Sequence, residues 1–252
     1  MPTRPGPPRQ ARARGRFQLV EDNGLLKSVL VPIHQAGWPF IAAALVATVL
    51  LYLAWAPLAG VGLVAALFCV YFFRDPDRVV PVRPGLVVSP ADGMVTAVDS
   101  VPPPEELGMG DQPLTRVSIF LNVFDVHVNR IPTDGTIAEL AYRKGKFVNA
   151  ASDKASEDNE RQTVRLTTAD GRDIAFVQIA GLIARRIVCN LRQGQGVRTG
   201  ERFGLIRFGS RADVYLPDGV SALVASGQRM VAGESVIADL ASDEGPRPGE
   251  AR

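Results

Sequence analysis

A long stretch without charged side chains constrains this chain more than any other feature. Residues 28–73 contain no Asp, Glu, Lys or Arg, and their centre reads GWPFIAAALVATVLLYLAWAPLAGVGLVAALFCVYFF. A transmembrane helix needs about 20 apolar residues, so the stretch is too long for one pass and fits two short ones. Pro57, Gly60 and Gly62 mark a turn between the passes. We therefore expect a membrane-associated helical hairpin over residues 28–73.

The flanks of the hairpin predict its orientation. Four aromatic residues lie near the ends of the two passes, as in an aromatic belt: Trp38, Tyr52, Trp55 and Tyr71. Basic residues precede the hairpin, and Arg74 and Arg78 follow it, so both ends are expected to face the cytoplasm at the cell membrane. The second segment is short for a full span. A hairpin that dips into one leaflet therefore stays open, as does a buried core hairpin of a soluble protein.

The chain before the hairpin, residues 1–27, is predicted to be a disordered basic tail. Its first 18 residues, MPTRPGPPRQARARGRFQ, are rich in Pro, Gly and Arg and have almost no apolar side chains. The apolar run that follows begins too late and is too long for a secretory signal. Positive charge in the tail would add attraction to anionic lipid.

Composition excludes some partners and groups. The net charge of +2 gives no indication of a nucleic-acid partner. The two histidines, His34 and His127, do not share a ligand spacing, so no metal site is expected. Cys69 and Cys189 lie far apart in different surroundings, and a disulfide between them is not expected.

Residues 74–240 have a different pattern, with short runs of Val, Ile, Leu and Phe separated by Gly, Pro and Asp. This pattern is typical of β-strands and turns. The Ala-Asp-Gly-Arg segment at 169–172 is expected to join two strands as a hairpin. A continuous strand is expected through IFLNVFDVHVNRIP, with Asp125 and His127 on one face. Only residues 144–160 have weak helical or loop character, and residues 241–252 read as a polar tail.

Two later segments echo each other. GQGVRTGERFGLI (194–206) and GQRMVAGESVIAD (227–239) share Gly-Gln at the start and Gly-Glu at the same offset. Each reads as a turn, a short strand, a second turn and a strand, which is the rhythm of a small barrel-sandwich. We therefore predict a mainly β fold, with a barrel-sandwich-like catalytic domain over residues 74–240 behind the N-terminal hydrophobic helical hairpin.

The segment IRFGSRADVYLP (206–217) looks like a strand broken by Gly209 and Ser210. A tight turn or bulge is one interpretation, and backbone chemistry is the other. Asp92, His127 and Ser210 each have ordinary structural interpretations alone, but together they are the parts of a nucleophilic relay. Ser210 lacks the Gly-x-Ser-x-Gly elbow. A hydroxyl that directly follows a Gly carbonyl on a strained turn can, however, attack that carbonyl.

Five motifs carry a family resemblance: FFRDPDRVVP (72–81), SPADG (89–93), FDVHVNRIP (124–132), KGKFVNA (144–150) and GERFGLIRFGSRADVYLP (200–217). In these the chain resembles the short bacterial and archaeal phosphatidylserine decarboxylases, which are pyruvoyl-dependent. The resemblance implies that Ser210 attacks the Gly209 carbonyl and that the chain then cleaves between them. Residue 210 would become a pyruvoyl group at the start of an α chain, 210–252, leaving a β chain, 1–209. His127, oriented by Asp92, would match the family's general base.

The same resemblance implies the reaction. Phosphatidylserine in the membrane would be decarboxylated to phosphatidylethanolamine, in phospholipid biosynthesis, with the pyruvoyl group as electron sink. His127 would protonate the carbon that loses CO2. Four cations are candidates for the substrate phosphate: Lys144, Lys146, Arg207 and Arg211. The sequence leaves open whether the chain forms a homo-oligomer.

One position departs from the family pattern, and two other functions stay open. Longer members of the family carry a second histidine three residues after the first, where this chain has Arg130. The division of roles around His127 is therefore open at this stage. The chain could also be a pyruvoyl-dependent decarboxylase of another amine, although a soluble substrate needs no anchor. It could otherwise be a non-catalytic, membrane-anchored β domain in which Gly209 and Ser210 form a bulge.

Overall fold

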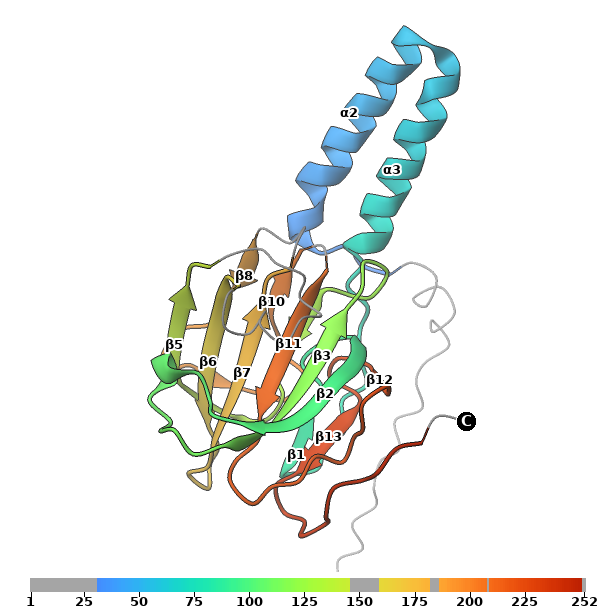
Figure 1. Ribbon diagram of the computed structural model, residues 1–252. Helices are drawn as coiled ribbons and strands as arrows, with labels where there is room; N and C mark the ends of the chain where they lie inside the picture. The colour runs from blue at the N-terminus through green and yellow to red at the C-terminus, as the bar shows by residue number, and fades with distance from the viewer. Residues whose placement is uncertain (1–30, 146–158, 182–185, 208, 251–252) are drawn as a thin grey trace, which may run out of the picture. The chain divides into compact units, whose positions relative to one another are not determined.

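The computed structural model describes residues 31–145, 159–181, 186–207 and 209–250 (Figure 1). The chain divides into two units, Met1–Val31 and Pro32–Arg252, and the account below concerns the second. The predicted basic tail, residues 1–27, lies outside the described residues. So does most of the polar segment at 144–160.

Two apolar helices, α2 and α3, form the predicted hairpin. Pro39 lies in the first turn of α2, where its fixed φ favours helix and its missing N–H costs nothing. The helices approach closely at Gly62, where an added Cβ would lie 2.7 Å from the Thr48 Cα. Gln35–Ala54, 20 residues long, is long and apolar enough to cross a membrane, whereas Ala56–Phe72 is shorter. The helical elements are η1 (Gln35–Gly37), α2 (Trp38–Ala54), η2 (Ala56–Leu58), α3 (Ala59–Phe72) and η3 (Glu105–Leu107).

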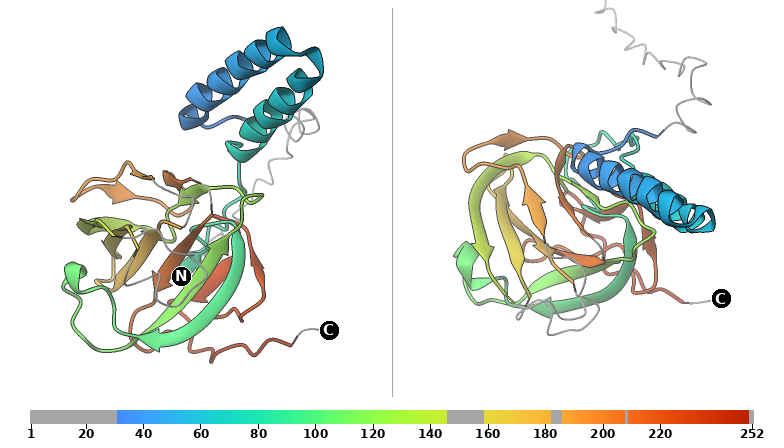
Figure 2. Two further views of the ribbon diagram at one scale, coloured as in Figure 1. Left: turned by 45° about the horizontal axis from the view of Figure 1, so that its top comes forward. Right: turned by 90° about the horizontal axis from the view of Figure 1, so that it is seen from above.

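The rest of the described chain is mainly β, as predicted. An eight-stranded antiparallel sheet in the order β12-β2-β3-β11-β7-β6-β5-β9 curls into a half-barrel (Figure 2). A three-stranded sheet, β4-β10-β8, and a two-stranded sheet, β1-β13, complete the domain. The strands are β1 (Leu86–Val88), β2 (Gly93–Val101), β3 (Leu114–Leu121), β4 (Val128–Arg130), β5 (Gly135–Arg143), β6 (Arg161–Thr167), β7 (Asp173–Ile179), β8 (Ile187–Cys189), β9 (Gly196–Val197), β10 (Arg202–Ile206), β11 (Ser210–Tyr215), β12 (Arg229–Met230) and β13 (Val236–Asp239).

The two echoing segments each fold into two successive strands, β9 and β10 in the first segment and β12 and β13 in the second. The short strands β9 and β12 form the two edges of the eight-stranded sheet, and β10 and β13 each enter one of the smaller sheets. Four glycines at equivalent places in the two segments adopt positive φ, between 78° and 91°: Gly194, Gly200, Gly227 and Gly233. The shared glycines therefore serve the same turns in both copies.

The turn predicted at 169–172 is confirmed, but the continuous strand through 124–128 is wrong. Strands β6 and β7 pair antiparallel around that turn, which the Thr168 N–H closes on the Arg172 carbonyl. Between β3 and β4, by contrast, Asn122–Asp125 forms a turn. Asp125, Val126 and His127 lie outside any strand, so strand alternation does not set the direction of their side chains. Side-chain hydrogen bonds of Asn122 and Asp125 close this turn, and strand periodicity does not reveal them.

The end of the hairpin belongs to the core of the β domain. Phe72 and Phe73 are fully buried in one cluster with Val126, Val128 and Leu205. Within the hairpin segment, the His34 N–H donates to the Phe73 carbonyl at 2.8 Å, which joins the two ends of the hairpin. The hairpin and the β domain are therefore joined by packing as well as by the chain.

Candidate active site

Ser210 lies at the start of β11, in the middle of the eight-stranded sheet. It pairs with Leu121 of β3, and β7 runs along the other side of β11 (Figure 1). The side chain is fully buried, and its Oγ has no hydrogen-bond partner among the described residues. A buried polar group without a partner costs about 1–3 kcal/mol, and a catalytic role is one explanation for such a group. The unpartnered hydroxyl distinguishes Ser210 from an ordinary turn serine.

Gly209 presents the bond that would be cleaved in a conformation that favours glycine. Its φ is +70°, in the left-handed region. A Cβ built at this position meets nothing within 4 Å, so the requirement for Gly comes from the backbone and not from packing. The Gly209 N–H donates to the Nε2 of His127 at 3.4 Å. The imidazole therefore lies one peptide from Ser210.

His127 is fully buried, and its neighbours fix its protonation. The Nδ1 lies 2.9 Å from the Asp125 carbonyl and donates to it, which leaves Nε2 as the acceptor that Gly209 meets. The Phe72 ring packs against the imidazole with centroids 4.2 Å apart. Burial lowers the pKa of His127 to about 4. The ring is therefore neutral at pH 7, with its free nitrogen facing the Gly209–Ser210 segment.

The structure places Asp92 beside this site but not on His127. The Asp92 carboxylate pairs with Arg78 at 2.7 Å and accepts the Ala232 N–H at 2.8 Å. In the described part of the chain it makes no hydrogen bond to His127, so the expected orientation of the imidazole by this carboxylate is not present. The Asp125 carbonyl orients it instead. Burial raises the pKa of Asp92, and the nearby charge of Asp125 raises it further.

Of the predicted phosphate ligands, Arg211 is already paired. Its guanidinium forms two hydrogen bonds to Asp213, at 2.8 and 2.9 Å, and both side chains are buried. We attribute the presence of Arg211 in the motif to this ion pair with Asp213. The pair argues against Arg211 as a ligand of the substrate phosphate. Lys144 is exposed on the surface, and Lys146 lies outside the described residues.

Arg207 has a better position for an anion. Its guanidinium lies 5.0 Å from the centre of the Phe40 ring of α2, at the base of the hairpin. The Nε has no hydrogen-bond partner among the residues that the structure describes. Burial and the positive charge of Arg186 lower its pKa, as expected where two cations lie close together. An anion at this place would be favoured by both cations.

Arg130 lies where longer members of the family carry a second histidine, and it has a structural role here. Its two terminal nitrogens donate to the Gly200 carbonyl at 2.9 Å and to the Pro76 carbonyl at 2.8 Å. It thereby joins the segment after the hairpin to the turn before β10. Its hydrogen bonds do not involve His127 or Ser210. Among the described residues, His127 is therefore the imidazole available to Ser210.

Sequence reasoning missed two features of the site. One is the Phe72 ring on His127, and the other is a buried amide pair in which Gln178 Nε2 donates to Asn129 Oδ1 at 2.8 Å. Gln178 lies opposite Ala212, on the face of the sheet that Ser210 shares, because Ser210 and Ala212 are two residues apart in β11. The signal that could have identified Gln178 is a lone amide in the apolar run IAFVQIAG.

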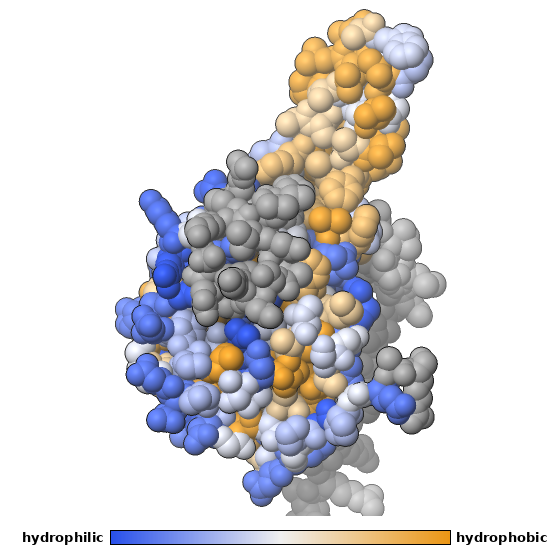
Figure 3. All heavy atoms as spheres, viewed as in Figure 1, coloured by the Kyte–Doolittle hydropathy of each residue, from blue (hydrophilic) through white to orange (hydrophobic). Residues whose placement is uncertain are grey.

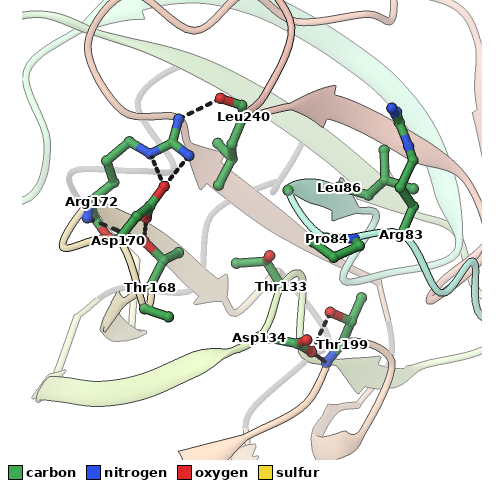
Figure 4. Close-up of a pocket in the computed structure, with 12 residues that line it drawn as sticks. Arg83, Pro84, Leu86, Thr133, Asp134, Thr168, Asp170, Arg172, Thr199 and Leu240 are labelled. Carbon is green, nitrogen blue, oxygen red and sulfur yellow. Dashed lines mark hydrogen bonds and ion pairs between the residues drawn. The ribbon is translucent and has the colours of Figure 1, made fainter. Parts of the chain in front are cut away.

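A pocket of about 280 Å³ lies elsewhere on the domain (Figure 4). It is next to the β6–β7 turn, where β7 begins. Ile179, at the other end of β7, pairs with Arg211, the residue after Ser210. Its charged groups are engaged: Arg172 pairs with Asp170, and Asp134 accepts from Thr199. We therefore assign the chemistry to the Ser210 segment and not to this pocket.

Comparison with known proteins gives consistent matches. The family model described as phosphatidylserine decarboxylase matches residues 65–238. Three bacterial proteins named phosphatidylserine decarboxylase proenzyme are similar over most of their length. The protein of Paramagnetospirillum magneticum is 57% identical (95% of this chain, 100% of the relative), that of Cereibacter sphaeroides 55% (90% and 98%), and that of Ruegeria pomeroyi 58% (84% and 96%).

Proposed function

The chain belongs to the phosphatidylserine decarboxylase family, and we propose that it makes the catalytic group of its reaction from its own Ser210. It is a self-processing proenzyme that decarboxylates phosphatidylserine to phosphatidylethanolamine in phospholipid biosynthesis. The observation that carries the proposal is the buried, unpartnered Ser210 Oγ directly after Gly209, whose N–H meets the neutral imidazole of His127.

Processing begins with a proton transfer within this segment. The Nε2 of His127 takes the Ser210 hydroxyl proton, and Oγ attacks the Gly209 carbonyl carbon. The peptide C–N bond breaks, and its nitrogen takes the proton back from His127, which leaves an ester. Rotation of the Ser210 side chain brings Oγ to Nε2, and the imidazole exchanges its Gly209 N–H contact for the hydroxyl.

Elimination completes the cleavage. Removal of the Ser210 Cα proton breaks the Cβ–Oγ bond, so that Gly209 leaves with a carboxylate and residue 210 becomes a dehydroalanine. Water then replaces the amino nitrogen of residue 210, which departs as ammonia, and a pyruvoyl group remains. Ser210 fits this conversion because it is fully buried and its Oγ carries no hydrogen bond that cleavage would have to break.

His127 also serves the decarboxylation. A pyruvoyl group at residue 210 would supply a carbonyl for the substrate amine and an electron sink for the electrons that CO2 leaves behind. The neutral imidazole accepts the proton that the substrate ammonium must lose, and it returns a proton to the carbon that lost CO2. The pKa of about 4 keeps the imidazole unprotonated at pH 7, and it makes the return of a proton from the imidazolium to carbon energetically easy. In this proposal Asp92 does not bond to His127 itself, because its hydrogen-bond partners are Arg78 and Ala232.

The substrate is held from the hairpin side. Arg207, over Phe40 at the base of the hairpin, is the proposed ligand of the phosphate. The hairpin holds the catalytic domain at the cell membrane on its cytoplasmic side. Its apolar surface and the basic residues on both flanks support that placement. The described site offers no group of three or more His, Cys, Asp or Glu side chains for a metal.

The direct test compares the chain with its Ser210→Ala variant on denaturing gels and in an assay of CO2 release from phosphatidylserine. We expect two fragments, 1–209 and 210–252, and activity from the unsubstituted chain. Ser210→Ala should stay intact and inactive. Asp218→Asn, at an exposed loop residue, is the control and should process normally. Efficient cleavage or decarboxylation by Ser210→Ala would disprove the proposal.

A further inference from the structure

The turn Asn122–Asp125 presents one large apolar side chain to the outside. Phe124 is 62% exposed at its tip. The turn is rigid, because the Phe124 N–H donates to Asn122 Oδ1 at 2.8 Å and the Asn122 N–H donates to Asp125 Oδ2 at 2.9 Å. The exposure of Phe124 is therefore built into the fold and does not result from a loose loop.

The turn is fastened to the last turn of α3. The Tyr71 hydroxyl and the Arg74 guanidinium both donate to the Phe124 carbonyl, at 3.1 and 2.6 Å. The Phe124 ring meets the Phe68 ring edge to face, with centroids 6.5 Å apart. The exposed ring of Phe124 thus continues the apolar surface of the hairpin onto the catalytic domain.

The residues around Phe124 are of the kind that lies at a membrane–water boundary. Trp38 and Tyr71 are exposed at the end of the hairpin where α2 begins and α3 stops, and the Arg74 guanidinium lies 3.9 Å from the Tyr71 ring centre. Tyr, Trp and Arg are enriched at this level of a bilayer. The hydrophobic surface runs down the hairpin to the β domain (Figure 3).

The same turn also holds the catalytic imidazole. Asp125, next to Phe124, supplies the carbonyl that receives His127 Nδ1–H, and its carboxylate pairs with Arg229. One side of the turn therefore faces outward beside the hairpin, and the other side orients His127. The distance along the chain between the two functions is three residues.

We propose that the Asn122–Asp125 turn is a membrane contact, in which Phe124 enters the interface of a phospholipid bilayer and sets His127 at the level of the lipid headgroups. The inference rests on the proposed function only for its consequence, which is the delivery of bilayer lipid to the site. The partner is the lipid surface, because the exposed ring continues an apolar surface bordered by Trp, Tyr and Arg.

The functional test uses the processed full-length enzyme and its Phe124→Ser variant. On phosphatidylserine in vesicles, the variant should lose about tenfold or more in activity, as expected for withdrawing a Phe ring from an apolar surface. On monomeric short-chain phosphatidylserine it should match the unsubstituted enzyme, and its self-cleavage should be complete. Tyr142→Ser, which removes a 52% exposed aromatic side chain from β5, is the matched control and should behave normally on both substrates.

Contact with lipid is tested without any activity. Phe124→Trp, in a Trp38→Phe, Trp55→Phe background, should be quenched by brominated phospholipids in vesicles, whereas Tyr142→Trp in that background should not. Absence of quenching at position 124 would overturn the proposal, and so would equal losses of Phe124→Ser on both substrates. Failure of the unsubstituted chain to cleave or decarboxylate would instead contradict the proposed function, and the quenching result would still stand.

Discussion

The imidazole of His127 owes its chemistry to its surroundings. An ordinary histidine has a pKa of about 6.5, but burial lowers that of His127 to about 4. The Asp125 carbonyl holds Nδ1–H, and the unprotonated Nε2 faces the Gly209–Ser210 segment. The ring is therefore unprotonated over the whole physiological range of pH.

This environment predicts the pH dependence of self-cleavage. Precursor made by cell-free synthesis and shifted to buffers of decreasing pH should cleave at a constant rate down to about pH 5, and then more slowly as His127 takes up a proton near pH 4. His127→Gln should slow cleavage by about 10²- to 10⁴-fold at pH 5 and above, and by less as the pH falls below about 4. A rate that falls with a midpoint near 6.5 would contradict the assigned environment.

Acid stability provides the control for that profile. Since the folded pKa of His127 lies below the unfolded one, protons bind more readily to the unfolded chain as the pH falls from about 6.5 to about 4. The contribution of His127 to stability is thus present above that window and decreases within it. Circular dichroism at each pH must show a folded chain before a slower rate is assigned to the base.

At the level of single residues, the sequence predicted candidate reacting groups but not their hydrogen-bond partners. The structure brings Gly209 onto His127, with Ser210 the next residue in the chain, and their proposed roles stay a prediction. The orientation of His127 by a backbone carbonyl could not be read from the sequence, because every residue has a carbonyl. From the sequence, the Asp92 carboxylate was a suitable group to orient His127, but in the structure it is bonded to Arg78 and Ala232.

Among the elements, α3 has two roles that its composition does not separate. Most of its surface is exposed and apolar, whereas Phe72 at its end is fully buried and packs on His127. The unbroken apolar run made the hairpin predictable. That run gives no sign of where membrane contact stops and packing on the β domain starts, because the same side chains suit both environments.

Replacing Phe72 tests the second role. Phe72→Ala should lower the free energy of unfolding by about 3–5 kcal/mol, because it leaves a cavity in the cluster with Val128 and Leu205. Val64→Ala, at a 68% exposed position of the same helix, should change stability by no more than about 0.5 kcal/mol. Both are measured by denaturant unfolding in detergent. Equal effects would show that the end of α3 is not part of the β-domain core.

The strands were predictable in kind more than in extent. Turn residues placed β6–β7 and the two echoing strand pairs correctly. The break between β3 and β4 was not visible, because FDVHV alternates like a strand while Asn122 and Asp125 fold it into a turn. Specific side-chain bonds of this kind depend on position and not on periodicity.

For the whole molecule, the proposed cleavage site predicts how the two fragments would stay together. Strand β11 would belong to the small fragment, yet it pairs over six residues with β3 and over five with β7, both in the large fragment. The fragments should therefore co-elute in native size-exclusion chromatography and separate only after denaturation. Loss of the small fragment on a native column would contradict the central place of β11 in the sheet.

The central claim is that Ser210 becomes the catalytic group, and mass spectrometry of the small fragment tests it most directly. The account predicts a fragment of residues 210–252 with a blocked N-terminus, lighter by one ammonia than a peptide that begins with serine. Treatment with borohydride should add two hydrogens to its ketone. A fragment with an intact Ser210 amino terminus, or a chain that remains whole from residue 1 to 252, would contradict the account.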